Sequence, residues 1–136
     1  MFVVVALTAV CGGIVSHVRG GYQRDRAVIL NFGENVSFHP YGECGEMMEQ
    51  GWRLVGEYQW TGPTFLEQPM RDAGIPCFER ITAVYLFDYD ANDTNHIEQI
   101  LSLPEMRKLY IVCVISDDDL AKLRNMKPGH VELMLI

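Results

Sequence analysis

The sequence predicts an α/β protein: a short solenoid of parallel strands and helices, preceded by an N-terminal transmembrane helix. Two observations lead to this prediction. Residues 1–18 carry no charge, and three apolar triplets recur at a nearly constant interval toward the end of the 136-residue chain. We therefore expect four segments. They are a transmembrane helix at 1–18, a juxtamembrane helix and cap strand at 19–40, an irregular insert at 41–80 and the solenoid at 81–136.

The first segment, residues 1–18, is uncharged and apolar. A helix of that length spans about 27 Å, close to the roughly 30 Å hydrocarbon core of a bilayer. A cleaved signal peptide, a lipoprotein signal at Cys11 and a buried element of a soluble domain are the alternatives. No basic residue precedes the apolar run, and the bulky Val10 stands where a lipoprotein signal has a small residue. We therefore expect a single-pass membrane protein held by residues 1–18.

The flank of the apolar segment bears on orientation. Arg19, Arg24 and Arg26 follow the segment and no basic residue precedes it, so the positive-inside rule places the domain in the cytoplasm. If translation starts further upstream and adds basic residues, the domain is exported, and the side of the membrane stays open. Cleavage of the segment would instead give a secreted or periplasmic binding protein.

The part of the chain after Val18 is acidic. The formal net charge is −7, and no basic stripe is present to neutralise phosphates, so nucleic acid is not an expected partner. Cysteines at 11, 44, 77 and 113 lack the spacing of a zinc site. We expect free, partly buried thiols, with a disulfide between Cys44 and Cys77 as the alternative.

Residues 19–40 favour a helix followed by a strand. Residues 27–30 form an apolar patch on a helical pattern, and Gly33 supplies a stop signal. Residues 35–38 then alternate polar and apolar side chains up to Pro40, which is typical of a short strand. We expect these two elements to cap the N-terminal side of the solenoid.

Residues 41–76 contain many glycines and prolines, which interrupt every regular period. This stretch is therefore expected to be mostly loop. Short strand pieces at 52–55 and 58–60 and a brief helix at 64–73 are the elements that its local patterns support.

The repeat lies in the last third of the chain. Apolar-x-apolar triplets begin at Val84, Leu109 and Leu133, 25 and then 24 residues apart, which is within the range of leucine-rich repeats. Apolar residues at helical spacing stand between the triplets: Ile97, Ile100, Leu101 and Leu103, then Leu120, Leu123 and Met126. One such unit cannot bury its apolar face alone, so we expect a leucine-rich-repeat-like solenoid with its strands paired in parallel.

The centres of the three triplets are the candidate binding residues. Tyr85, Tyr110 and Met134 are expected to line the concave strand surface, where repeat proteins commonly bind partners. The expected partner is a protein of unknown identity. An open edge at the C-terminal strand also favours pairing with a second copy of the chain.

No constellation of residues points to catalysis. The sequence contains no HExxH, GxSxG, P-loop or GxGxxG, so we expect no enzymatic activity, no catalytic residue, no metal and no cofactor. Residues 88–93 begin like a calcium loop, but Asp93 replaces the glycine at position six and Gln99 replaces the glutamate at position twelve. A weak calcium-binding loop built from Asp88, Asp90 and Asp93 is kept as an alternative function.

Several of these segments also occur in a known family. The chain resembles the short membrane-anchored leucine-rich-repeat-like proteins of planctomycete-type bacteria, in its segments Phe2–Leu7, Gln23–Val28, Phe32–Phe38 and Ile115–Leu123. The last of these matches a Val-Thr-Asp-x-x-Leu-x-x-Leu element. The chain differs from the family in lacking basic residues before the apolar segment and an asparagine ladder after the strands. The resemblance implies a membrane-tethered protein-interaction scaffold and no reaction.

Overall fold

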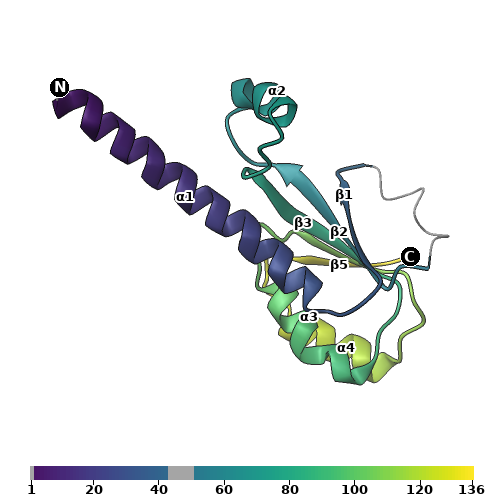
Figure 1. Cartoon of the computed structure of the whole chain (residues 1–136). Coiled ribbons are helices and arrows are strands. Elements are labelled where there is room, and N and C mark those ends of the chain that lie inside the picture. The colour runs from purple at the N-terminus through teal and green to yellow at the C-terminus, as the bar shows by residue number, and fades with distance from the viewer. Residues whose placement is uncertain (1, 43–50) are drawn as a thin grey trace.

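The computed structural model describes residues 2–42 and 51–136, which form one five-stranded sheet with three helices on one of its faces (Figure 1). In chain order the elements are α1 (Phe2–Leu30), β1 (Val36–Pro40), β2 (Leu54–Trp60), α2 (Thr64–Asp72), β3 (Glu79–Leu86), the short 3-10 helix η2 (Ala91–Asp93), α3 (Thr94–Leu101), β4 (Lys108–Ile111), α4 (Asp117–Met126) and β5 (Glu132–Leu135). The helices α1, α3 and α4 lie together, whereas α2 lies apart at one end of the sheet.

The strands follow one another across the sheet in chain order, from β1 to β5. The strands β3, β4 and β5 are parallel, with Val84 opposite Leu109 and Leu109 opposite Leu133. The three triplets therefore lie side by side, as their spacing predicted. The first and third residues of each triplet lie on the same side of the sheet, because side chains alternate along a strand. All of them except Leu135 belong to the buried core or pack against it.

The predicted solenoid fold is wrong. A leucine-rich-repeat solenoid contains only parallel strands, and each repeat contacts only its neighbours. Here β2 runs antiparallel to β3, and β1 pairs in parallel with β2 to complete a mixed sheet. The repeat spacing does not distinguish a solenoid from this fold. It shows only that two successive strand–helix units have similar lengths, and ordinary crossover connections between parallel strands can also have similar lengths.

The predicted transmembrane helix is also wrong. Among the described residues, no helix combines the length and the apolar character needed to cross a membrane. The sequence of α1 runs for 29 residues, but Gly12, Gly13, Ser16 and His17 interrupt its apolar part, and Arg19 begins its charged part. The prediction of a single-pass membrane protein is therefore wrong as well. The prediction of a separate juxtamembrane helix after residue 18 is also wrong, because α1 continues as one helix to Leu30.

The two halves of α1 have different surroundings. In the C-terminal half, Gly21, Asp25 and Ile29 are buried, and their spacing of four residues places them on one face of the helix. The N-terminal half extends away from the sheet, and Val3 and Val10 remain 71% and 59% exposed (Figure 1). Only the C-terminal half therefore contributes to the described core.

An ion pair fixes α1 against β3. Asp25 is 1% exposed, and its carboxylate accepts hydrogen bonds from Nε and Nη2 of Arg80 at 2.8 and 3.0 Å. The backbone N–H of Ile81 donates a third hydrogen bond to Asp25 at 3.1 Å. The hydrogen bond with Asp25 raises the pKa of Arg80. A Cβ atom at Gly21 would lie 2.8 Å from Nη1 of Arg80, so glycine leaves room for the guanidinium group.

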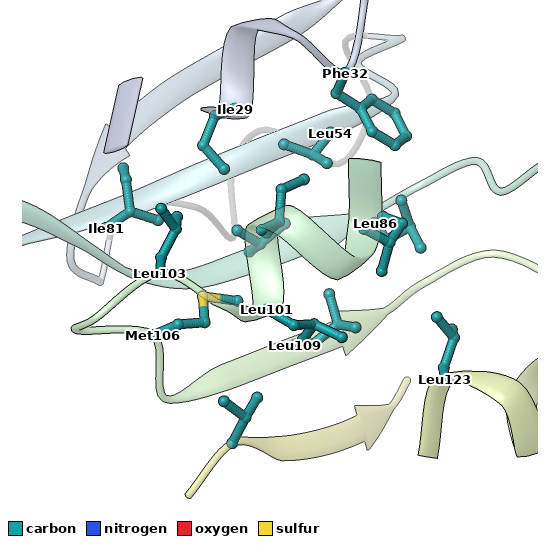
Figure 2. Packing of buried hydrophobic residues seen from close by; sticks show 14 of the residues in the cluster. Ile29, Phe32, Leu54, Ile81, Leu86, Leu101, Leu103, Met106, Leu109 and Leu123 are labelled. Carbon is teal, nitrogen blue, oxygen red and sulfur yellow. The ribbon is translucent and has the colours of Figure 1, made fainter. Parts of the chain in front are cut away.

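The core lies between the sheet and the three helices (Figure 2). The sheet contributes Leu54, Leu86 and Leu109, all with no exposed surface, and the helices contribute Ile29, Ile97 and Leu123. In place of the two short strand pieces predicted at 52–55 and 58–60, the structure has one continuous strand, β2, between β1 and β3. The described part of the expected insert thus contains a central strand and the helix α2.

Glu79 begins β3, and its carboxylate lies 3.7 Å from Nε of Arg71. Burial raises the pKa of Glu79, while the positive charges of Arg71 and Arg26 act in the opposite direction. A carboxyl group whose pKa is raised on folding binds its proton more tightly in the folded state. The protonated carboxyl group of Glu79 therefore contributes its full stabilisation of the folded protein below the ordinary pKa of 4.5. This contribution is lost as the pH rises through the pKa that Glu79 has in the folded state.

We therefore expect Glu79→Gln to become progressively more stable relative to the wild type as the pH rises above 4.5. Glutamine keeps the shape of the side chain and carries no charge. The difference in the free energy of unfolding between the two proteins therefore reports the ionisation of Glu79. Urea unfolding of both proteins over a series of pH values measures it. A difference that stays constant over the series would contradict the assignment.

Candidate binding surface on the open face of the sheet

The face of the sheet that is turned away from α1, α3 and α4 carries the three predicted binding residues. Tyr85 pairs in register with Tyr110, and Tyr110 pairs with Met134. On the other side, Tyr85 is opposite Val55, which is opposite Ser37. These five residues form one line across all five strands, which we call the central row. The structure thus brings Tyr85, Tyr110 and Met134 together on the open face.

The two tyrosines of the central row are stacked. Their ring centroids are 4.4 Å apart, and their planes differ by 11°. Neighbouring strands are about 4.8 Å apart, so two rings in register on parallel strands can lie face to face. One face of the Tyr110 ring is therefore covered by Tyr85. The other face is directed toward β5, where Met134 is 40% exposed.

A second line of side chains runs beside the central row. It contains His39, Glu57, Ala83, Lys108 and Glu132, which are paired in register. Glu57 is only 4% exposed, and its Oε2 accepts a long hydrogen bond of 3.5 Å from the hydroxyl of Tyr85. A buried carboxylate therefore lies next to the stacked tyrosines.

Sequence reasoning did not identify Glu57 as the hydrogen-bond partner of Tyr85, or Ser37 and His39 as residues of the same face. It did not place residues 54–60 in the sheet, so β1 and β2 had no predicted register with β3. The one local signal was a charged residue within the apolar run of residues 54–58. Such a residue needs a polar partner when it is buried, and Tyr85 supplies one.

Ser37 and His39 form a hydrogen-bonded pair on this face, with 2.8 Å between Oγ and Nε2. In the described part of the chain, His39 makes no ion pair with Glu57, whose contact is with Tyr85. A nucleophile–base–acid arrangement requires the base to be oriented by a third group. The geometry therefore describes a polar patch beside the central row and not a catalytic triad.

The acidic loop that begins like a calcium site has another role in this structure. Arg53 donates hydrogen bonds to Asp88 at 3.2 Å and to Asp93 at 2.9 Å, and the side chain of Asp90 accepts the N–H of Asn92 at the start of η2. Within residues 2–42 and 51–136, no group of three or more His, Cys, Asp or Glu side chains is placed to hold a metal ion. These aspartates anchor the loop from β3 to α3.

The structure describes the side chains of two cysteines, Cys77 and Cys113. Cys77 is buried and Cys113 is partly buried, and both are free thiols. Burial raises the pKa of Cys113, which disfavours the nucleophilic thiolate. Cys44 belongs to residues 43–50, so the alternative of a disulfide with Cys77 lies outside the described residues.

The fold and this surface define the class of protein: a two-layer α/β domain with a mixed sheet whose one face is covered by helices and whose other face carries one stacked pair of tyrosines. Comparison with known protein families, curated proteins and solved structures gives no match to the chain. The resemblance to membrane-anchored leucine-rich-repeat-like proteins thus remains a prediction from the sequence alone.

Proposed function

We propose that the chain is a protein-binding module that holds an arginine-bearing segment of its partner on the central row. The observation that carries the proposal is the stacked pair Tyr85–Tyr110 beside the buried carboxylate of Glu57. Tyrosine is enriched at binding surfaces because it offers a large rigid area and a polar group.

The geometry favours a flat cation. A guanidinium group stacks on a tyrosine ring, and the face of Tyr110 that is directed toward Met134 would continue the stack that Tyr85 begins. Met134 is unbranched and partly exposed, so it can adjust to a group inserted beside it.

The charges near the central row also favour a cation. Glu57 and Glu132 lie in the adjacent line, against one cation at Lys108, and the whole chain carries a formal net charge of −7. An acidic protein attracts basic segments and speeds their encounter. Arginine combines this charge with the planar shape that the stack requires.

The proposal is tested with a blocked Gly-Arg-Gly-Arg-Gly peptide, its lysine counterpart and its glutamate counterpart. NMR titration follows the ring signals of Tyr85 and Tyr110 and the methyl signal of Met134. We expect the arginine peptide to shift these signals, the lysine peptide to bind more weakly and the glutamate peptide to have no effect. Tyr110→Ala should weaken binding of the arginine peptide by about tenfold, the ratio expected for loss of about 1.4 kcal/mol.

Tyr41→Ala is the matched control, because Tyr41 is an exposed tyrosine that lies after β1 and outside the central row. It should leave the titration unchanged. Equal binding of the lysine and arginine peptides would show that charge alone is recognised and would overturn the stacking argument. Shifts confined to residues outside the central row would overturn the proposal as a whole.

A further inference from the structure

The two edges of the sheet differ in how they are protected against pairing with another strand. At the β1 edge, the N–H of Tyr41 donates to the carbonyl of Tyr58, so the backbone groups of Tyr41 point toward β2. Backbone groups of successive residues point to opposite sides of a strand, so those of Val36, Phe38 and Pro40 point away from the sheet. Pro40 has no N–H, so this edge lacks one of its outward donors. Proline at such a position is a common protection of edge strands.

The β5 edge carries no such protection. The N–H groups of Glu132 and Ile136 donate to β4, at 2.8 and 3.0 Å, so alternation directs the N–H and carbonyl groups of Leu133 and Leu135 outward. In the described part of the chain, β5 pairs with β4 alone. Met134, Leu135 and Ile136 are 40%, 55% and 67% exposed. The edge therefore combines free backbone groups with exposed apolar side chains.

We propose that β5 pairs antiparallel with β5 of a second copy of this chain, centred on Met134, to form a two-fold symmetric dimer. This inference rests on the sheet edge and is independent of the proposed arginine binding. Leu133 of each copy would exchange backbone hydrogen bonds with Leu135 of the other, because these are the residues whose groups point outward. Met134 would then face Met134 of the second copy as a pair without hydrogen bonds.

This register suits the side chains. Leucine lies opposite leucine on the helix side of the sheet, and methionine lies opposite methionine on the open face. Glu132 lies opposite Ile136 of the second copy, so no two like-charged side chains are directly opposed, an arrangement that would be destabilising. A two-fold axis also closes the assembly, whereas pairing of β5 with a β1 edge would leave free ends and continue into a filament.

The dimer would join the two central rows. Met134 ends the row in one copy, and Met134 of the second copy would continue it through Tyr110 and Tyr85 of that copy. This face of the sheet would then extend over ten strands and carry two copies of the residues Tyr85, Tyr110 and Met134. The contact is small, so we expect a weak dimer that dissociates in the micromolar range or above.

Sedimentation velocity over a range of protein concentrations tests the proposal. The wild type should pass from monomer to dimer and form nothing larger. Leu135→Pro removes an outward N–H and leaves the bonds to β4 in place, and it should weaken the dimer by at least about tenfold. Leu135→Lys places a charge at the same edge position and should act in the same direction if the proline variant fails to fold. Val114→Lys is the control, because Val114 is fully exposed and outside the strands.

A cysteine at Met134 reports the register directly. Directly opposed residues in a pair without hydrogen bonds have Cα atoms about 4.5 Å apart, which is within disulfide reach. Mild oxidation of Met134→Cys should give a covalent dimer whose peptide map shows the bond between the two introduced cysteines, and Val114→Cys should not. A wild type that stays monomeric, dimers unaffected by both Leu135 variants, or progressive growth beyond the dimer would each overturn the proposal.

Discussion

Asp25→Ala is expected to lower the free energy of unfolding by about 3 to 5 kcal/mol, the range found when one partner of a buried ion pair is removed. The carboxylate accepts both hydrogen bonds of the Arg80 fork and the N–H of Ile81. Without the Asp25 carboxylate, the largely buried guanidinium group of Arg80 and the buried N–H of Ile81 both lose this hydrogen-bond acceptor. The loss is large because desolvation of both groups is no longer compensated.

Urea unfolding of the wild type and the variant measures this effect. Glu67→Ala is the matched control, because Glu67 forms an exposed ion pair with Arg71 at 3.2 Å. Its removal should change the free energy of unfolding by about 0.3 to 0.5 kcal/mol. The double variant Asp25→Ala and Arg80→Ala should lose less than the sum of the two single variants, because it leaves no unpaired charge. Similar losses for Asp25→Ala and Glu67→Ala would contradict the structure.

Leu109→Ala is expected to lower the free energy of unfolding by about 2 to 5 kcal/mol, the usual cost of truncating a buried leucine. Leu109 lies at the centre of the three parallel triplets and has no exposed surface. Its side chain packs in the cluster shared with Ile97 and Leu123 from the helices. Truncation leaves a cavity there that the flanking strands cannot close.

Met134→Ala is the control for this variant. Met134 is in the same sheet and is 40% exposed, so its truncation should cost clearly less than that of Leu109. Chemical unfolding of both variants under the same conditions provides the comparison. Equal losses would show that Leu109 does not face the core, and the assignment of the two faces of the sheet would then be wrong.

The C-terminal part of the fold could be predicted because its pattern is local and repeated. Each triplet places apolar residues at alternate positions, and the apolar residues after it have helical spacing. Those two signals sufficed to place Val84, Leu109 and Leu133 on neighbouring parallel strands. They also placed Tyr85, Tyr110 and Met134 on a common face, because a shared register fixes the side of every residue.

The N-terminal part was harder to predict because its structure depends on distant partners. Residues 54–60 contain a glycine and three aromatic or charged residues, and their polar and apolar residues do not alternate regularly. The local sequence pattern therefore did not predict a central strand. The burial of Asp25 depends on Arg80, which is 55 residues away in the chain. The apolar start of α1 suggested a membrane span when it was read without the charged and packed half of the same helix.

The repeat spacing alone could not distinguish a solenoid from a mixed sheet. Both place similar strand–helix units in succession, and they differ only in what lies beside the first unit. Here β2 fills that position in the opposite direction, and α1 covers the core from outside the repeat. Because the chain has only about two repeats, the elements outside them determine whether the fold is a solenoid or a mixed sheet.

In the proposed complex, the row formed by Tyr85, Tyr110 and Met134 receives an arginine side chain. Intermolecular nuclear Overhauser effects between the arginine peptide and the labelled protein test it most directly. We expect contacts from the guanidinium-bearing end of the arginine side chain to the ring of Tyr110 and the methyl group of Met134. Contacts to the helix side of the sheet or to Tyr41 in their place, or a bound peptide without contact to either predicted residue, would contradict it.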